Sequence, residues 1–79
     1  MNKLHIFTQC RIDGEDAPEV IPLGKIAISL DEIIVVSQMI DKHDCIMKDC
    51  VHLGFKGGQN LAIKADFAEI IELFDNYQT

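Results

Sequence analysis

The chain has 79 residues, 48% of them apolar, and 13 acidic against 7 basic side chains give a formal net charge of −6. This length predicts a single domain over residues 1–79, with a thin margin of stability because a small domain buries only about 60% of its unfolded surface. No apolar run approaches the roughly 20 residues that span a bilayer, and the acidic balance disfavours direct binding to nucleic acid or an anionic membrane.

The cysteines and the start of the chain predict a cytoplasmic protein. Three cysteines are an odd number, which argues against a disulfide framework and for reduced thiols. The first residues alternate with polar side chains instead of forming a continuous apolar stretch, so no export signal is expected.

Alternation over Lys3–Ile12 predicts a first strand. Its expected core face carries Leu4, Ile6, Thr8, Cys10 and Ile12. Asp13-Gly14 is a turn signal. A short extended piece over residues 19–23 belongs at an edge or bend, because Pro22 cannot donate to a ladder. A turn at Gly24 would separate it from another alternating segment over residues 26–30.

The middle of the chain predicts three more strands. Four consecutive β-branched residues begin the segment 33–40, whose apolar groups on both faces favour a central strand. A polar turn over residues 41–44 leads to an extended region from about Cys45 to Phe55. Gly57-Gly58 then marks a hairpin turn before a last strand over residues 60–64.

The C-terminal segment predicts an amphipathic helix. Its apolar stripe recurs at helical spacing and comprises Phe67, Ile70, Ile71, Leu73, Phe74 and Tyr77. Asp66 is a suitable N-cap, and Glu69 three residues later completes a capping box. The predicted fold is α+β, with four or five antiparallel strands in a curved sheet covered by this helix.

The segment 43–52 reads H-x-C-x4-C-x-H. If it folds as a hairpin about Met47-Lys48, its ligand-type side chains share one face. These are His43, Cys45, Cys50 and His52, a set that suits zinc. Met-Lys is a poor two-residue turn, however, because neither residue readily adopts positive φ. A continuous strand from Cys45 to Phe55 would instead separate the cysteines, and we favour that reading, with no cofactor.

Catalytic motifs are absent from the sequence. Neither Ser29 nor Ser37 lies in a G-x-S-x-G elbow, and thiols without a C-x-x-C pattern do not indicate redox catalysis. Residues 55–60 lack the spacing of a phosphate-binding loop and precede a strand. We therefore expect a non-enzymatic protein.

The predicted helix also carries an acidic ridge formed by Asp66, Glu69, Glu72 and Asp75. A solvated face explains most such runs, yet helices usually mix charges for i,i+4 support and this one has no lysine. The ridge therefore predicts a basic or nucleic-acid-binding protein partner.

Residues 24–36 read G-K-I-A-I-S-L-D-E-I-I-V-V, and residues 51–74 read V-H-L-G-F-K-G-G-Q-N-L-A-I-K-A-D-F-A-E-I-I-E-L-F. This order of strand, turn and helix resembles short bacterial and phage proteins of unassigned function and the small flagellar FlbD-type proteins. The resemblance covers about two-thirds of the chain, implies a β-meander closed by one helix, and carries over no catalytic residue.

We expect a small protein-interaction or regulatory module, and one version is a phage or mobile-element inhibitor of a nucleic-acid-binding host complex. Two alternatives remain open. One is a small zinc-stabilised module that uses residues 43–52. The other is an oligomeric structural accessory, in which an exposed strand near Val20–Leu23, or the first strand, pairs with a second copy to form a homodimer.

Overall fold

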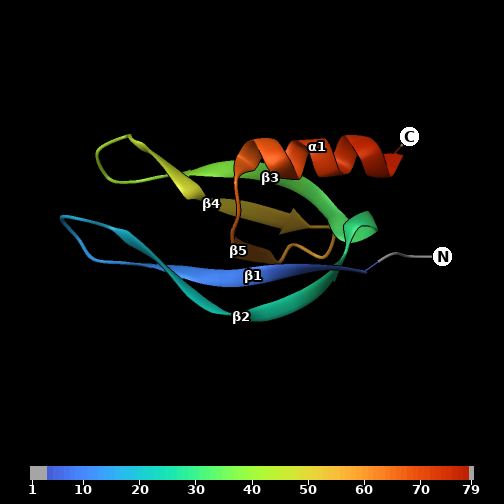
Figure 1. Cartoon of the computed structure of the whole chain (residues 1–79), viewed down its shortest axis with the longest axis horizontal. Coiled ribbons are helices and arrows are strands. Elements are labelled where there is room, and N and C mark those ends of the chain that lie inside the picture. The colour runs from blue at the N-terminus through green and yellow to red at the C-terminus, as the bar shows by residue number, and fades with distance from the viewer. Residues whose placement is uncertain (1–3, 79) are drawn as a thin grey trace.

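The computed structural model describes residues 4–78, and these form five strands and one C-terminal helix (Figure 1). The strands are β1 (Leu4–Asp13), β2 (Glu19–Ser29), β3 (Ile33–Ile40), β4 (Ile46–Phe55) and β5 (Asn60–Lys64). A short 3-10 turn, η1 (Leu30–Glu32), connects β2 to β3, and the helix is α1 (Phe67–Gln78). The α+β prediction is confirmed, with five strands in the sheet.

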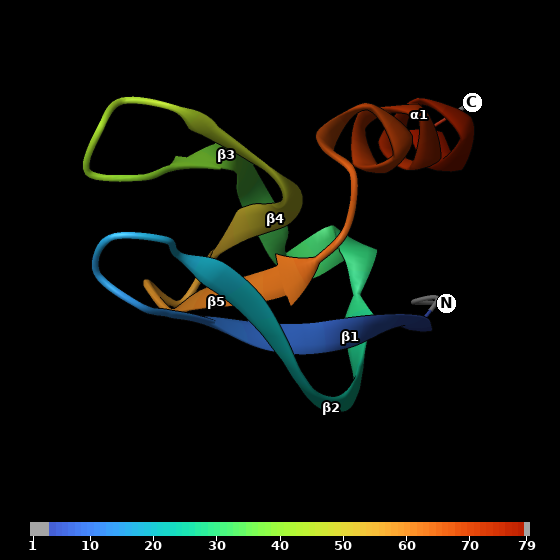
Figure 2. The same cartoon turned by 60° about the vertical axis from the view of Figure 1, so that its left-hand side comes forward.

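The sheet is antiparallel and has the order β2-β1-β5-β4-β3. Two hairpins, β1–β2 and β3–β4, are joined through the short strand β5, which pairs with both β1 and β4. The edge strands β2 and β3 are consecutive in the chain and only three residues connect them, so the sheet has to curve strongly. Figure 2 shows this unclosed, curved sheet, with the tips of the two hairpins close together.

The inward face of β1 differs from the prediction. Phe7 and Cys10 are buried, whereas Leu4 and Ile6 are 68% and 59% exposed. Phe7 and Cys10 are three residues apart, so a regular strand would point them to opposite faces. The register with β2 shifts between Thr8 and Cys10, and such an irregularity increases the local twist. Opposite faces of β1 therefore turn inward on either side of the shift.

The second strand is longer than the sequence indicated. Glu19–Ser29 is one continuous strand, and Gly24 lies at the β-bulge, where β2 has one more residue than β1, instead of forming a turn. The expectation that Pro22 belongs to an edge strand is confirmed, because β2 is the outermost strand on its side.

The predicted central position of residues 33–40 is wrong. These residues form β3, which is the other edge strand of the sheet and pairs with β4 alone. One face of β3 packs against the core through Ile33 and Val36. Ile34, Val35 and Ile40 are exposed to solvent, which explains why the strand is apolar on both faces without being central.

The core lies between the sheet and α1, and its fully buried members sit on the central strands β4 and β5. It consists of Phe7, Ile28, Leu30, Val51, Leu53, Ile63 and Ile70. The helix packs mainly against β3 and β4 and directs Leu73, Phe74 and Tyr77 to this core. Within residues 4–78 no helix is long and apolar enough to cross a membrane.

The start of α1 confirms half of the predicted capping box. The Ala68 backbone N–H donates to Asp66 Oδ1 at 2.9 Å, so Asp66 caps the helix. The reciprocal bond from the Asp66 backbone N–H to the Glu69 side chain is not formed in the part of the chain that the structure describes. Asp66 therefore has a structural role, and its carboxylate is already engaged.

Because Phe7 of β1 points inward and Ile6 points outward, truncating these two neighbours should change the stability by different amounts. Phe7→Ala removes a buried ring and should lower the free energy of unfolding by roughly 3–5 kcal/mol. Ile6→Ala removes an exposed side chain and should cost less than about 1 kcal/mol. Urea unfolding of both variants measures the difference, and a larger loss for Ile6→Ala would contradict the observed orientation of β1.

Candidate interaction surface

The exposed edge of β3 is unusual for an edge strand. Its eight residues read I-I-V-V-S-Q-M-I and contain no charge, no proline and no glycine. Ile34, Val35 and Ile40 are 62%, 50% and 58% exposed. Unpaired backbone groups along such a strand are a template for pairing with another chain. Natural edge strands usually carry charged residues or proline, which prevent such pairing.

The opposite edge of the sheet has the protection that β3 lacks. β2 contains Glu19, Pro22, Gly24 and Lys25 within its 11 residues, and Pro22 offers no N–H to a partner strand. The bulge near Gly24 further distorts this edge. Because the two edges share one sheet, the difference points to β3 as the edge that is open to a partner.

Two register shifts affect β3, but only one adds a residue to it. Ile33 pairs with Phe55 and Val35 with Gly54, which leaves Ile34 as an extra residue of β3. Farther along, Gln38 pairs with Val51 and Met39 with Met47, so the three extra residues there belong to β4. The backbone of β3 from Val35 to Ile40 therefore contains no bulged residue.

The acidic ridge of α1 is present in a reduced form. Glu69, Glu72 and Asp75 are exposed, and within residues 4–78 the single ion pair joins Lys42 to Asp16 on the hairpin tips. Asp66 is also exposed, but it serves as the helix cap. Since α1 packs on β3 and β4, this unneutralised negative charge belongs to the same half of the molecule as the open edge.

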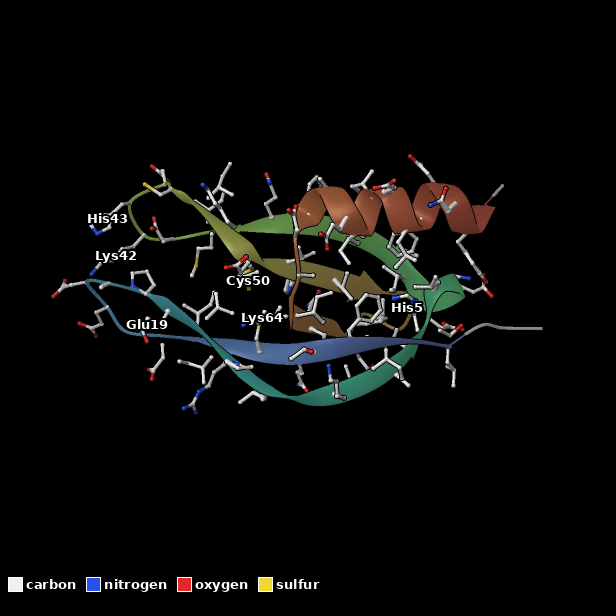
Figure 3. All side chains as sticks on the ribbon, viewed as in Figure 1. His5, Glu19, Lys42, His43, Cys50 and Lys64 are labelled. Carbon is white, nitrogen blue, oxygen red and sulfur yellow. The ribbon has the colours of Figure 1, made fainter. Side chains whose placement is uncertain are left out.

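The H-x-C-x4-C-x-H segment does not bring its four side chains together. Met47 and Lys48 lie inside β4, so the hairpin about these two residues does not form. The predicted continuous strand is present, but it begins at Ile46 and leaves Cys45 in the turn. His43 and Cys45 are exposed in the β3–β4 turn, whereas Cys50 is buried and His52 half-buried in β4. Figure 3 shows His43 at the hairpin tip, well away from Cys50. Residues 4–78 contain no group of three or more potential metal ligands.

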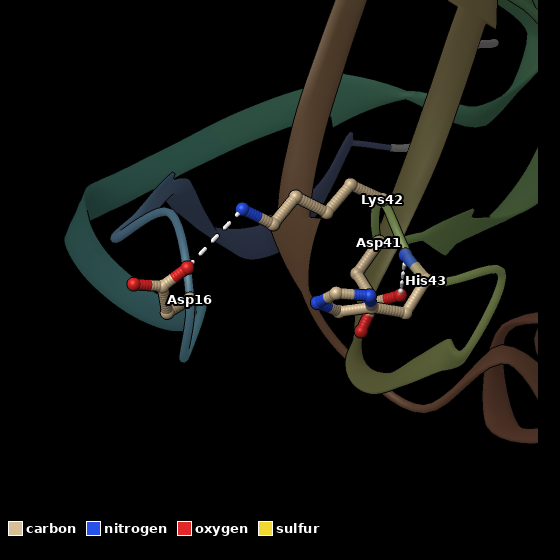
Figure 4. Close-up of polar contacts among 4 residues, drawn as sticks. All are labelled: Asp16, Asp41, Lys42 and His43. Atoms are coloured by element: carbon tan, nitrogen blue, oxygen red, sulfur yellow. Dashed lines mark hydrogen bonds and ion pairs between the residues drawn. The ribbon is translucent and has the colours of Figure 1, made fainter.

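The β3–β4 turn is built by Asp41, not by Met47-Lys48. Asp41 Oδ1 accepts the backbone N–H groups of Cys45 and His43 at 2.9 and 2.8 Å, and these bonds hold the pKa of Asp41 below its usual value. Asp44 adopts a φ of 63°, which aspartate tolerates better than most residues. Lys42 Nζ reaches Asp16 Oδ1 at 3.4 Å across the two hairpin tips (Figure 4).

The structure reveals one contact that sequence reasoning missed, between Cys10 of β1 and Cys50 of β4. Their sulfur atoms are 3.7 Å apart, and the residues are 4% and 1% exposed. Burial is the main reason that the pKa of Cys50 rises to about 12, and the hydrogen bond and charge of Cys10 add to it. Burial also raises the pKa of Cys10, although the Cys50 thiol and the positive charge of Lys64 oppose that effect. Both thiols are therefore neutral near pH 7.

Comparisons with protein-family models, curated protein sequences and solved structures find no significant match to this chain.

The raised pKa of Cys50 predicts a loss of stability in alkaline solution. An exposed cysteine ionises near pH 9.0, and Cys50 in the folded chain only near 12. Between these values the unfolded chain has released a proton that the folded chain keeps, so the free energy of unfolding falls as pH rises. Below pH 9.0 both states are protonated and the thiol contributes no slope.

Urea unfolding from neutral pH to about pH 11 tests this, because the slope of stability against pH counts the protons released on unfolding. Cys50→Ala should lower the stability at all pH values and reduce the alkaline slope. Cys45→Ala, which changes an exposed thiol, should leave the slope as it is. Equal slopes in the two variants would contradict the assignment.

Proposed function

We propose that this chain is a small, acidic, non-enzymatic protein-interaction module that binds its partner by strand addition at the open edge of β3. The observation that carries the proposal is the uncharged sequence of β3 with Ile34, Val35 and Ile40 exposed along it. In strand addition, main-chain hydrogen bonds supply affinity and alternate side chains supply specificity.

Energetics indicate that the partner must cover side chains as well as pair its backbone. From Val35 to Ile40 the edge has room for roughly four to six hydrogen bonds, each with a net value of about 0.5–1.5 kcal/mol. Their sum of roughly 2–9 kcal/mol scarcely offsets an association cost of about 4–15 kcal/mol. Burying three half-exposed aliphatic side chains adds about 1 kcal/mol each, so a partner with apolar side chains on the added strand is favoured.

Charge favours a basic partner. Glu69, Glu72 and Asp75 lie exposed on α1 without ion pairs in the described part of the chain, and the formal net charge is −6. Complementary charge steers association and suppresses wrong partners more than it adds affinity. A nucleic-acid-binding protein has such a basic surface, and a phage or mobile-element inhibitor that occupies it is the specific version of this proposal.

One groove of the described part of the chain is poorly equipped for acid–base chemistry, which supports a non-enzymatic role. A groove of about 650 Å³ lies between β2 and the turn from β4 to β5. Glu32 is the one titratable side chain in its lining, whereas general acid–base chemistry needs a positioned pair. The zinc alternative has no comparable support, since its four proposed ligands are spread between the hairpin tip and β4.

A charge on the open edge should block the partner. Val35→Lys and Ile40→Lys each place an ammonium group where an added strand would pack, and each should weaken capture by about tenfold, which corresponds to about 1.4 kcal/mol. Ile6→Lys is the matched control, because Ile6 is equally exposed on the internal strand β1. Capture from a lysate of the source cells, followed by titration of the purified partner, measures the effect.

Charge reversal tests the second element of the proposal. Glu69→Lys, Glu72→Lys and Asp75→Lys together should slow association and remove most of its salt dependence. Capture that is unchanged by reversal excludes the basic partner, and equal losses for Val35→Lys and Ile6→Lys exclude the β3 edge.

If light scattering of the purified chain gives twice the monomer mass, and Val35→Lys restores the monomer, the occupant of β3 is a second copy.

A further inference from the structure

We propose that Cys10 and Cys50 form an oxidation site, at which a hydroperoxide converts the two buried thiols into a disulfide that links the β1–β2 and β3–β4 hairpins. The two sulfur atoms already touch at 3.7 Å, although the residues are 40 positions apart in the chain. This inference rests on the thiol pair alone and does not depend on the proposed partner binding.

The approach of the two sulfurs is a product of the fold. Residues 48–50 bulge out of the ladder with β3, and Cys50 pairs instead with Lys64 of β5. On the other side, β1 turns a different face inward after its register shift, which brings Cys10 inside. A disulfide needs a sulfur–sulfur distance of about 2.05 Å, so the two atoms must approach by roughly 1.7 Å from their present contact.

The surroundings tolerate the product. Both residues are almost completely buried, and a disulfide is an uncharged, apolar group that needs no hydrogen-bond partner. Its formation removes only a weak thiol hydrogen bond. The two cysteines are 40 positions apart, so a disulfide between them closes a long loop and constrains the denatured chain strongly.

A groove large enough for a small oxidant lies beside the pair, although neither cysteine lines it, so local opening of the strands has to complete the path to the sulfur atoms. Lys64 and Asp49, the ladder partner and the chain neighbour of Cys50, line a groove of about 500 Å³ between the hairpins. Hydrogen peroxide fits this space, whereas a bulky disulfide reagent would require the hairpins to open. Burial raises the pKa of both thiols, but the Cys50 hydrogen bond and the charge of Lys64 partly offset this rise at Cys10, whereas every cause raises the pKa of Cys50. We therefore assign Cys10 as the attacking group.

The reaction balances in two steps. The Cys10 sulfur attacks one oxygen of the hydroperoxide, the O–O bond breaks, and a sulfenic acid and water (or an alcohol) form. The Cys50 sulfur then attacks the Cys10 sulfur, the S–O bond breaks, and the hydroxyl group leaves as water with the Cys50 proton. Two thiols lose two hydrogens and two electrons, and the peroxide bond is reduced.

The chemistry is tested in the full chain carrying Cys45→Ser, which removes the exposed third thiol. After treatment with hydrogen peroxide, the intact monomer should lose the mass of two hydrogens, and thiol titration in denaturant should fall from two groups to none. Peptide mapping should join residues 10 and 50. Cys10→Ala and Cys50→Ala in the same background should form no internal disulfide. Thiols that stay unreacted, or that proceed to sulfinic acid without a disulfide, would overturn the proposal.

A redox equilibrium measures how much the native fold favours the disulfide between Cys10 and Cys50. The same chain is equilibrated, from the reduced and the oxidised side, with a small thiol and its disulfide, once native and once unfolded in urea. A link that stabilises the fold is itself stabilised by the fold, so the equilibrium constant for the bond should be on the order of 100-fold larger in the native chain. An equal or smaller constant in the native chain overturns the assignment of a preformed site.

Discussion

Ile63 pairs with Gln9 of β1 on one side and with Val51 of β4 on the other, and this row of residues holds the two hairpins in one sheet. Gln9–Ile63 is the single ladder pair between β1 and β5 in the described chain. Ile63 and Val51 are fully buried, so the connection is supported by core packing more than by ladder length. A five-residue strand thereby determines which strands are internal and which are edges.

This arrangement has consequences at both ends of the sheet. Because β5 occupies the second side of β1 and β4, the outer strands β2 and β3 have no neighbour beyond their own hairpin. β2 carries charges, proline and a bulge that discourage pairing, whereas β3 carries none of these from Val35 to Ile40. Beyond β5 the two hairpins face each other, and Cys10 meets Cys50 there. The open edge and the thiol pair therefore follow from the same junction.

Local signals predicted most of the elements correctly. Apolar spacing located α1, the Gly57-Gly58 signal located the β4–β5 turn, and residues 41–44 proved to be a turn. The order of the strands was not predictable in this way, because it depends on pairing between residues far apart in the chain. Residues 33–40 are apolar on both faces, and this pattern is the same for a central strand and for an exposed edge strand. The pattern alone therefore led to the wrong central position for β3.

The candidate sites also differ in whether local sequence signals or long-range pairing determine them. The exposed acids of α1 were visible in the sequence, although the capping role of Asp66 separates it from Glu69, Glu72 and Asp75. The near-symmetric spacing of residues 43–52 suggested one cluster, but Asp41 places the turn before Ile46 and the symmetry has no counterpart in the fold. The contact of Cys10 with Cys50 spans 40 residues, and alternation alone carries no information about it.

Amide hydrogen exchange of the monomer, resolved by residue, tests the central claim that β5 is the junction and β3 an open edge. The account predicts that Val51 and Ile63 are among the most protected amides. Alternate amides from Val35 to Ile40, which point away from β4, should exchange at least about 100-fold faster than these. Uniform protection along β3 in the monomer, equal to that of β5, would contradict the account.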